Sequence, residues 1–217
     1  MTHNLPALEA PLHRRTALSV SAALLVAAPL LSACSGETRP GTAAVVGGER
    51  ITTSSLQAQV GDVRAAQNRS EHAATLISNT PQLERIKLGK MIQLRVLERA
   101  AKDAGISVTT KEIEDARRAQ EGGRGAAALE QAALQGRVPL AAGQIDEEVR
   151  FQLLLGRLSE RYGEDKIIEP LAKASQALHI EVNPRYGAWD AQQVGLGPVA
   201  TPWITQRTRP EQAPAGA

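Results

Sequence analysis

The sequence predicts a mostly α-helical domain whose two ends are closed by short paired strands. Long segments over 81–104 and 144–162 repeat apolar residues at helical spacing, which is typical of packed helices. Short β-branched or alternating runs over 43–46 and 178–182 flank the helical region. Because a lone strand is stable only when it is paired, we expect these two runs to pair with each other.

Composition argues against several classes of function. Only five residues are aromatic, so the chain offers no stacking platform for nucleic acid, and a net charge of +2 gives no strong basic field. One cysteine and four histidines exclude a cysteine-based metal cluster and leave little for acid–base chemistry. No nucleophile–base pair or carboxylate pair stands out. We therefore expect no enzyme, no catalytic or metal-ligating residues, no cofactor, no small-molecule substrate and no nucleic-acid partner.

The first 33 residues are typical of an export signal. His13, Arg14 and Arg15 precede an uncharged apolar run over 17–31, which is shorter than a membrane-spanning helix. The run ends in Leu-Ser-Ala-Cys at Cys34, which resembles the bacterial lipobox. We predict a lipoprotein signal peptide over 1–33 and a lipid on Cys34 that anchors the chain at the extracytoplasmic face of the cell membrane. The alternative is an ordinary signal peptide with a chance cysteine, and the export route, general secretory or twin-arginine, stays open.

A polar linker over 34–42 leads into the first strand, and Gly47-Gly48 predicts a tight hairpin that returns over 49–51. Ser54 and Gln57 have the spacing of a capping box ahead of a helix with Leu56, Val60 and Val63 on one face. The stretch 68–79 is ambiguous. Thr80-Pro81 predicts the cap and first position of the next helix.

The predicted helix 81–104 has two apolar stripes. One holds Leu83, Ile86, Leu94, Leu97, Ala101 and Ala104. The other, opposite it, holds Leu88, Ile92 and Val96. Two explanations remain open for this second stripe: it is core in a helix packed on both sides, or it is a surface that binds unfolded clients.

Several shorter elements follow. Gly105 predicts a helix end, Thr109 with Glu112 predicts a capping box, and Gly122-Gly123-Arg124-Gly125 predicts a break before a short helix over 126–135. The helix over 144–162 is followed by a weaker one over 166–177 and the strand over 178–182. The stretch 195–217 holds four prolines without periodicity, so we expect a disordered tail there.

Three segments resemble the N-terminal domain of the SurA- and PrsA-type extracytoplasmic chaperones. The segment 45–52 is similar to the strand that opens that domain, 100–109 to the exit of its long helix, and 182–190 to the closing strand of actinobacterial members. The resemblance implies a domain over 43–194. Many relatives carry a parvulin prolyl-isomerase domain before the closing strand, but only 163–177 lies there, too short for a domain.

The resemblance implies a non-catalytic chaperone that holds unfolded or newly secreted polypeptides. Leu88, Ile92 and Val96 are then candidate client-binding residues. The alternative is an envelope scaffold or adaptor lipoprotein that uses the same helical surface to bind one folded partner.

Overall fold

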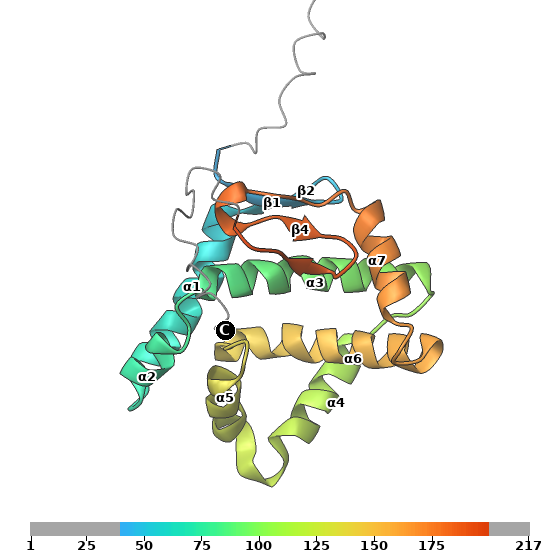
Figure 1. Ribbon diagram of the computed structural model, residues 1–217. Coiled ribbons are helices and arrows are strands. Elements are labelled where there is room, and N and C mark those ends of the chain that lie inside the picture. The colour runs from blue at the N-terminus through green and yellow to red at the C-terminus, as the bar shows by residue number, and fades with distance from the viewer. Residues whose placement is uncertain (1–39, 200–217) are drawn as a thin grey trace, which may run out of the picture. The chain divides into compact units, whose positions relative to one another are not determined.

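A computed structural model describes residues 40–199 of the chain (Figure 1). The predicted signal peptide, Cys34 and most of the predicted linker lie outside these residues. The strands are β1 (Thr42–Val46), β2 (Glu49–Thr52), β3 (Glu181–Val182), β4 (Trp189–Asp190) and β5 (Gly195–Leu196). The helices are α1 (Thr53–Asn68), α2 (Ala73–Ser78), α3 (Leu83–Asp103), α4 (Thr110–Glu121), α5 (Gly125–Gln135), α6 (Ile145–Tyr162) and α7 (Ile168–Ala177). The mostly helical prediction is confirmed.

The two ends of the helical region are joined by strand pairing, as predicted, but the closing strand is shorter than the predicted 178–182, because Leu178 is the C-cap of α7 and only Glu181 and Val182 pair. β1 is the central strand of a three-stranded sheet with the order β2-β1-β3, and both pairings are antiparallel. Ala44 lies opposite Val182, and the backbone N–H of Asn183 donates to the carbonyl of Ala43 at 2.9 Å. This clasp joins segments that are far apart in the sequence, so neither end can separate without leaving backbone groups of β1 unpaired.

The hairpin between β1 and β2 forms where Gly47-Gly48 predicted it. Both glycines have positive φ, 60° and 83°, which two-residue hairpin turns of type I′ require. The helix cap after β2 differs from the prediction. Thr52, instead of Ser54, is the N-cap of α1, and its side-chain oxygen accepts from the backbone N–H of Ser55 at 3.0 Å. The strand ends at Thr52, so the helix starts two residues earlier than a cap at Ser54 would place it.

Helix α3 lies in the middle of the fold. In Figure 1 it runs between the strand layer and α6, while α1 and α7 flank its two ends. Residues from both predicted stripes are buried, including Leu83, Leu97 and Ala101 of the first and all of the second. The hydrophobic core therefore surrounds α3.

The predicted start of this helix at Thr80-Pro81 is wrong. The ambiguous stretch before it folds into α2, and the Thr80 hydroxyl donates to the carbonyl of Leu76 at 2.9 Å, at the end of that helix. Thr80 also accepts from Arg64 of α1, both at its hydroxyl and at its carbonyl. These contacts use the threonine at the end of α2, and α3 begins at Leu83.

The predicted tail begins too early. β5 pairs with β4, with Trp189 opposite Leu196, and this hairpin packs on α3. The Gln93 side chain donates to the carbonyl of Val194 at 3.0 Å, and Arg85 donates to the carbonyl of Gly197 at 2.9 Å. Residues 195–199 thus belong to the fold, because side chains of α3 hold their backbone. The rest of the predicted tail lies outside the described residues.

Candidate client-binding surface

The three candidate client-binding residues on α3 are core residues. Leu88, Ile92 and Val96 are each 0% exposed. Strand β1, α1, α6 and α7 all contact α3, so no side of this helix is left uncovered along the second stripe. Of the two explanations that the sequence left open, core packing is the one that the structure shows, and the assignment of these residues to client binding is corrected.

Helices α4 and α5 form a V on the side of the fold opposite the strands and meet at the turn Gly122–Arg124 (Figure 1). Neither helix has a buried residue. Polar contacts join α4 to α6: Arg157 pairs with Glu112, Arg117 pairs with Asp146 at 2.9 Å, and Gln120 donates to Gln152 at 3.1 Å. We call α4, the turn and α5 the arm.

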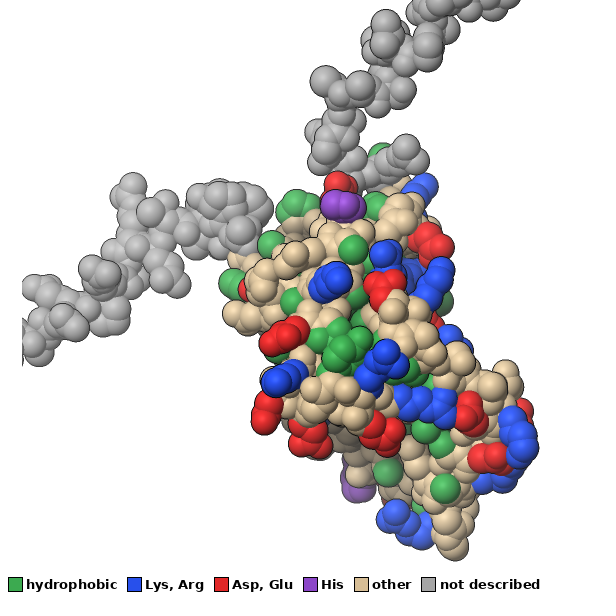
Figure 2. Space-filling view, turned by 90° about the vertical axis from the view of Figure 1, so that its right-hand side faces the viewer, with side chains coloured by type: hydrophobic (Ala, Val, Ile, Leu, Met, Phe, Trp, Pro, Cys, Tyr) green, Lys and Arg blue, Asp and Glu red, His purple; other side chains and the backbone are tan. Residues whose placement is uncertain are grey.

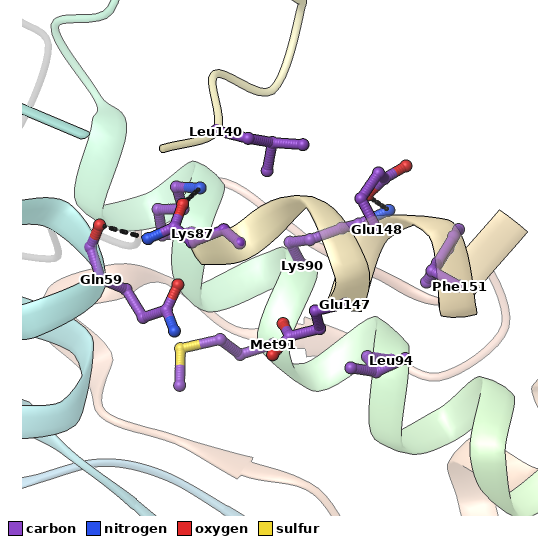
Figure 3. A pocket seen from close by; sticks show the side chains of 10 residues that line it. Gln59, Lys87, Lys90, Met91, Leu94, Leu140, Glu147, Glu148 and Phe151 are labelled. Atoms are coloured by element: carbon purple, nitrogen blue, oxygen red, sulfur yellow. Dashed lines mark hydrogen bonds and ion pairs between the residues drawn. The ribbon is translucent and has the colours of Figure 1, made fainter. Parts of the chain in front are cut away.

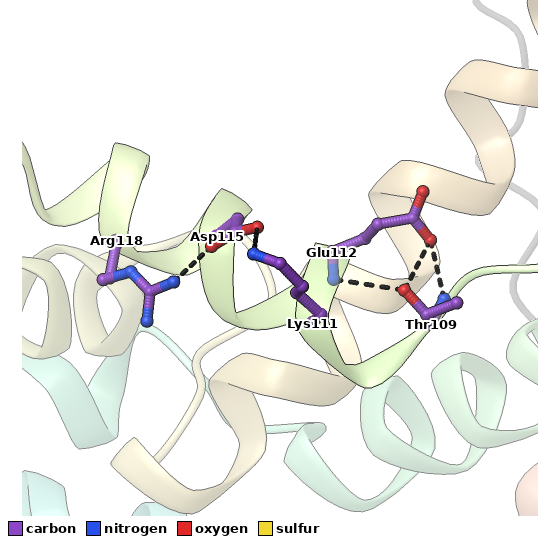
Figure 4. A network of polar contacts seen from close by, with 5 residues as sticks. All are labelled: Thr109, Lys111, Glu112, Asp115 and Arg118. Carbon is purple, nitrogen blue, oxygen red and sulfur yellow. Dashed lines mark hydrogen bonds and ion pairs between the residues drawn. The ribbon is translucent and has the colours of Figure 1, made fainter.

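The capping box predicted at the start of α4 is confirmed (Figure 4). The Thr109 hydroxyl accepts from the backbone N–H of Glu112 at 3.3 Å, and the Glu112 carboxylate accepts from the backbone N–H of Thr109 at 2.8 Å. The hydrogen bond from the Thr109 backbone is the first cause that lowers the pKa of Glu112 to about 2, and Arg157 adds to it. Glu112 therefore stays ionised under all physiological conditions and holds the arm to α6.

Helix α5 is apolar but is not buried. Seven of its eleven residues are Ala or Leu (GAAALEQAALQ), yet none of them is buried. A helix that is apolar on most sides is usually enclosed by its neighbours. Among the described elements, α5 has its main contacts with α4, the adjoining turn and α1. Ala126, Ala127 and Ala132 are exposed, whereas Leu129 and Leu134 are half-buried, so the free apolar surface of α5 consists of alanine side chains.

An open groove lies between α5 and the junction of α1 and α2. Its volume is about 490 Å³, which lies within the usual range for ligand sites. Its apolar lining includes Ala66, Ala127, Leu134 and Leu140. Its polar lining includes Arg69, Glu71, His72, Glu130 and Gln131. We call this the α5 groove. It combines a mixed-charge rim with apolar side chains, which suits a polypeptide segment better than a single charged ligand.

A second cavity, between α1, α3 and α6, is too small to be a binding site (Figure 3). Its volume of about 10 Å³ holds no more than about one water molecule. Lys87 lies there and donates to the side-chain oxygen of Gln144 at 2.6 Å, and Gln144 in turn donates to the carbonyl of Gln59 at 2.9 Å. Burial lowers the pKa of Lys87 to about 8. This polar chain connects three helices and is structural.

A further apolar patch lies on the side of the fold that carries α7. Figure 2 shows green side chains gathered near the middle of this side, with charged side chains around them. Tyr162 and Ile168, on either side of the α6–α7 turn, are 37% and 44% exposed.

Nothing in the described part of the chain has the geometry of a metal site. No three His, Cys, Asp or Glu side chains between residues 40 and 199 gather closely enough to hold an ion. Between α6 and β3 the chain forms α7 and its flanking turns, in the place where many relatives of the resembled family carry a parvulin domain.

The fold defines a class: a helical domain clasped by its terminal strands, with a protruding arm. The family described as SurA-like N-terminal domain matches residues 15–148, more than half of the chain. The chain therefore belongs to the family of SurA-like N-terminal domains, which are chaperone domains that act outside the cytoplasm. No curated protein and no solved structure matched the chain in the other two comparisons.

Sequence reasoning did not identify α5 as a candidate surface. An apolar stripe on a long helix indicates only that this face is apolar, and most such faces are buried. The stripes therefore do not indicate where a binding surface lies. The signal that was available is the composition of 125–135: alanine and leucine around most of a short helix, between Gly125 and Gly136, which limit its length.

Proposed function

We propose that this protein is a non-catalytic chaperone that holds unfolded or newly secreted polypeptides at the α5 groove. Membership of a chaperone family supports the class of function. The observation that carries the site is that α5 is rich in Ala and Leu yet has no buried residue, and it borders an open groove. An apolar helix that its neighbours cover only in part is a surface on which exposed apolar segments of a client lose water contact.

The chemistry of the groove fits weak and reversible binding. Alanine side chains contribute few methyl groups, and each buried group of this size adds only about 0.8 kcal/mol. Its rim carries one positive residue, Arg69, and two negative residues, Glu71 and Glu130. The groove therefore does not favour clients of one charge over clients of the other. A holdase needs this combination, because it must release each client and accept many sequences.

The site is tested by placing a charge in the groove. A chain of residues 35–217 retains every core residue of the described domain, and its suppression of aggregation is measured with two unrelated unfolded proteins. Ala127→Asp puts an unpaired carboxylate on the groove side of α5, so we expect suppression to fall several-fold while the melting temperature is unchanged.

Ala126→Asp is the matched control, since Ala126 is exposed in the same turn of α5 but does not line the groove. It should suppress aggregation like the unsubstituted chain. Equal suppression by both variants would contradict the α5 groove as the site. If the unsubstituted chain suppresses no aggregation and instead binds one folded envelope protein, the adaptor alternative replaces the chaperone.

We also propose that the chain is held at the extracytoplasmic face of the membrane by a lipid on Cys34. The apolar run over 17–31 and the Leu-Ser-Ala-Cys sequence that ends at Cys34 support this. No helix among residues 40–199 is long and apolar enough to cross a membrane. Two or more acyl chains make a stable anchor because each buried methylene contributes about 0.8 kcal/mol.

Metabolic labelling with a radioactive fatty acid tests the anchor. The full chain should incorporate label, Cys34→Ala should incorporate none, and Ser35→Ala should label normally. Label that persists in Cys34→Ala would place the lipid elsewhere and refute the assignment.

A further inference from the structure

A second groove, with a cationic lining, lies where α1, the start of α3 and the turn Pro184–Tyr186 meet. Its volume is about 320 Å³. Arg64, Arg85 and Arg185 line it, together with one acidic residue, Glu84. We call this the arginine groove. Three positive charges against one negative charge favour an anionic ligand.

The charges of these three arginines are not neutralised within the described domain. None of them forms an ion pair with a carboxylate of residues 40–199. Arg64 and Arg85 donate to neutral oxygens, at distances of 2.6–2.9 Å. The exposed Arg185 guanidinium lies over the Tyr186 ring, 5.0 Å from its centroid, which positions the group and leaves its charge in place.

A phosphate group is the anion that this lining fits. A guanidinium has five N–H donors in a planar fork, and the fork pairs with two phosphate oxygens at once. Three such groups around one groove have more donors than their contacts within the domain use. The head groups of membrane phospholipids carry a phosphate diester, and those of anionic phospholipids keep its negative charge uncompensated.

The arginine groove lies beside the point where the chain enters the domain. The Asn183 side chain donates to the carbonyl of Thr42 in β1 at 3.2 Å and accepts from the backbone N–H of Arg185, also at 3.2 Å. Thr42 is eight residues after Cys34, and extended chain of this length spans at most about 29 Å. A lipid on Cys34 therefore keeps the start of β1, and the turn that carries Arg185, close to the membrane surface.

We propose that the arginine groove binds the phosphate head groups of anionic phospholipids in the membrane that holds the chain. The proposal rests on the lipid anchor proposed at Cys34, which brings the groove to a membrane. Contact at this groove turns the strand side of the fold toward the bilayer, and the arm, on the side opposite the strands, points away from it (Figure 1). The α5 groove then stays accessible to clients.

Co-sedimentation with vesicles tests the groove on a chain of residues 35–217, which lacks Cys34. At an ionic strength of about 0.1 M, charges more than about 10 Å apart are largely screened. The chain should bind phosphatidylglycerol vesicles and not phosphatidylcholine vesicles. Arg185→Glu should weaken this binding by about five-fold or more, the effect of one basic residue near an anionic surface. Arg161→Glu is the matched control, because Arg161 is also exposed and lies over a tyrosine ring, 5.9 Å from the centroid of Tyr162, at the far end of α6. It should bind like the unsubstituted chain, and both variants should keep its melting temperature.

Four results would overturn the proposal. They are equal binding to both kinds of vesicle, equal losses in Arg185→Glu and Arg161→Glu, binding that inorganic phosphate abolishes at constant ionic strength, and binding of a hexaglutamate peptide in place of vesicles. The third would identify a site for the free ion and the fourth a site for acidic polypeptides. The labelling of Cys34 tests the anchor separately. Vesicle binding that depends on Arg185 supports the groove whether or not Cys34 is labelled, and a labelled chain that binds no vesicles refutes the groove but not the anchor.

Discussion

Lys87 is the residue at which burial and charge conflict most strongly. It is 3% exposed and makes one hydrogen bond, to Gln144, although an ammonium group has three donors. Burial lowers its pKa from 10.5 to about 8, while the charges of Glu147 and Glu148 raise it in part. In the unfolded chain Lys87 binds its proton up to about pH 10.5, so it opposes folding below about pH 8 and its effect fades as the pH rises between these values.

Lys87→Met should therefore stabilise the protein at pH 7. The variant keeps the length of the side chain and removes the buried charge, and the shift of the pKa sets an upper limit of about 3 kcal/mol. Gln144 keeps one donor at the same oxygen, the backbone N–H of Ala141 at 3.3 Å. Urea unfolding at pH 7 and pH 10 measures the effect: the unsubstituted chain should gain stability relative to the variant as the pH rises.

Lys90→Met provides the control for this prediction. Lys90 pairs with Glu148 at 2.8 Å and remains partly exposed, so the variant should not share the gain in stability at pH 7. If the difference in free energy of unfolding between Lys87→Met and the unsubstituted chain is the same at pH 7 and pH 10, then Lys87 is not a buried charge in solution.

At the scale of elements, most boundaries follow from a few local groups. The capping box at Thr109 and the hairpin at Gly47-Gly48 form as predicted because every group involved is within three residues in the sequence. Thr80 does not cap α3, because its partners are Leu76 in α2 and Arg64 in α1. Thr80 and Pro81 are residue types that favour the start of a helix, but Thr80 forms its hydrogen bonds with α1 and α2 instead.

The hairpin glycines differ in what lies beside them, and this predicts unequal effects of two alanine substitutions. Both positions have positive φ, so each substitution costs about 1 kcal/mol. A Cβ at Gly47 would also lie 2.8 Å from Cδ2 of Leu178, whereas nothing lies within 4 Å at Gly48. Chemical denaturation should show Gly47→Ala to be the less stable of the two variants, by up to about 1 kcal/mol, since Cδ2 is the end of a side chain that can partly turn aside. Equal losses would mean that Leu178 moves aside without cost.

At the scale of the whole domain, the strand clasp and the β4–β5 hairpin make residues near the end of the described chain part of the core. Val182 packs against the core from β3, and Leu196 packs against it from β5. Removing side chains of this kind costs about 1.5–3 kcal/mol each, against a total stability of about 5–15 kcal/mol for a domain.

Truncating the chain before Leu178 or after Val194 should therefore lower its melting temperature much more than truncating it after Val199. A chain that ends before Leu178 loses β3 and the hairpin and should show no cooperative melting. A chain that ends at Val194 loses β5 and should melt several degrees below the intact protein, contrary to the expectation that residues beyond 194 form only a tail. A chain that ends at Val199 keeps every described contact and should lose far less. Thermal melting followed by circular dichroism checks all three, and equal melting temperatures would mean that the clasp does not stabilise the domain.

The sequence by itself determined the features that depend on neighbours in the chain. Periodicity placed the long helices to within a few residues, glycines and a capping box placed turns and a helix start, and the need of a lone strand for a partner predicted that β1 and β3 would pair. The resemblance over 43–190 identified the family.

Only the tertiary structure decided which apolar faces are covered. Leu88, Ile92 and Val96 form a stripe that is compatible with core or surface, and they are core because α3 is enclosed by α1, α6, α7 and β1. Helix α5 has a composition suited to burial but meets too few elements to be buried. β5 is two residues long and has no period to detect, yet α3 holds the backbone on either side of it. Burial depends on contacts between segments distant in the sequence, and local patterns do not specify them.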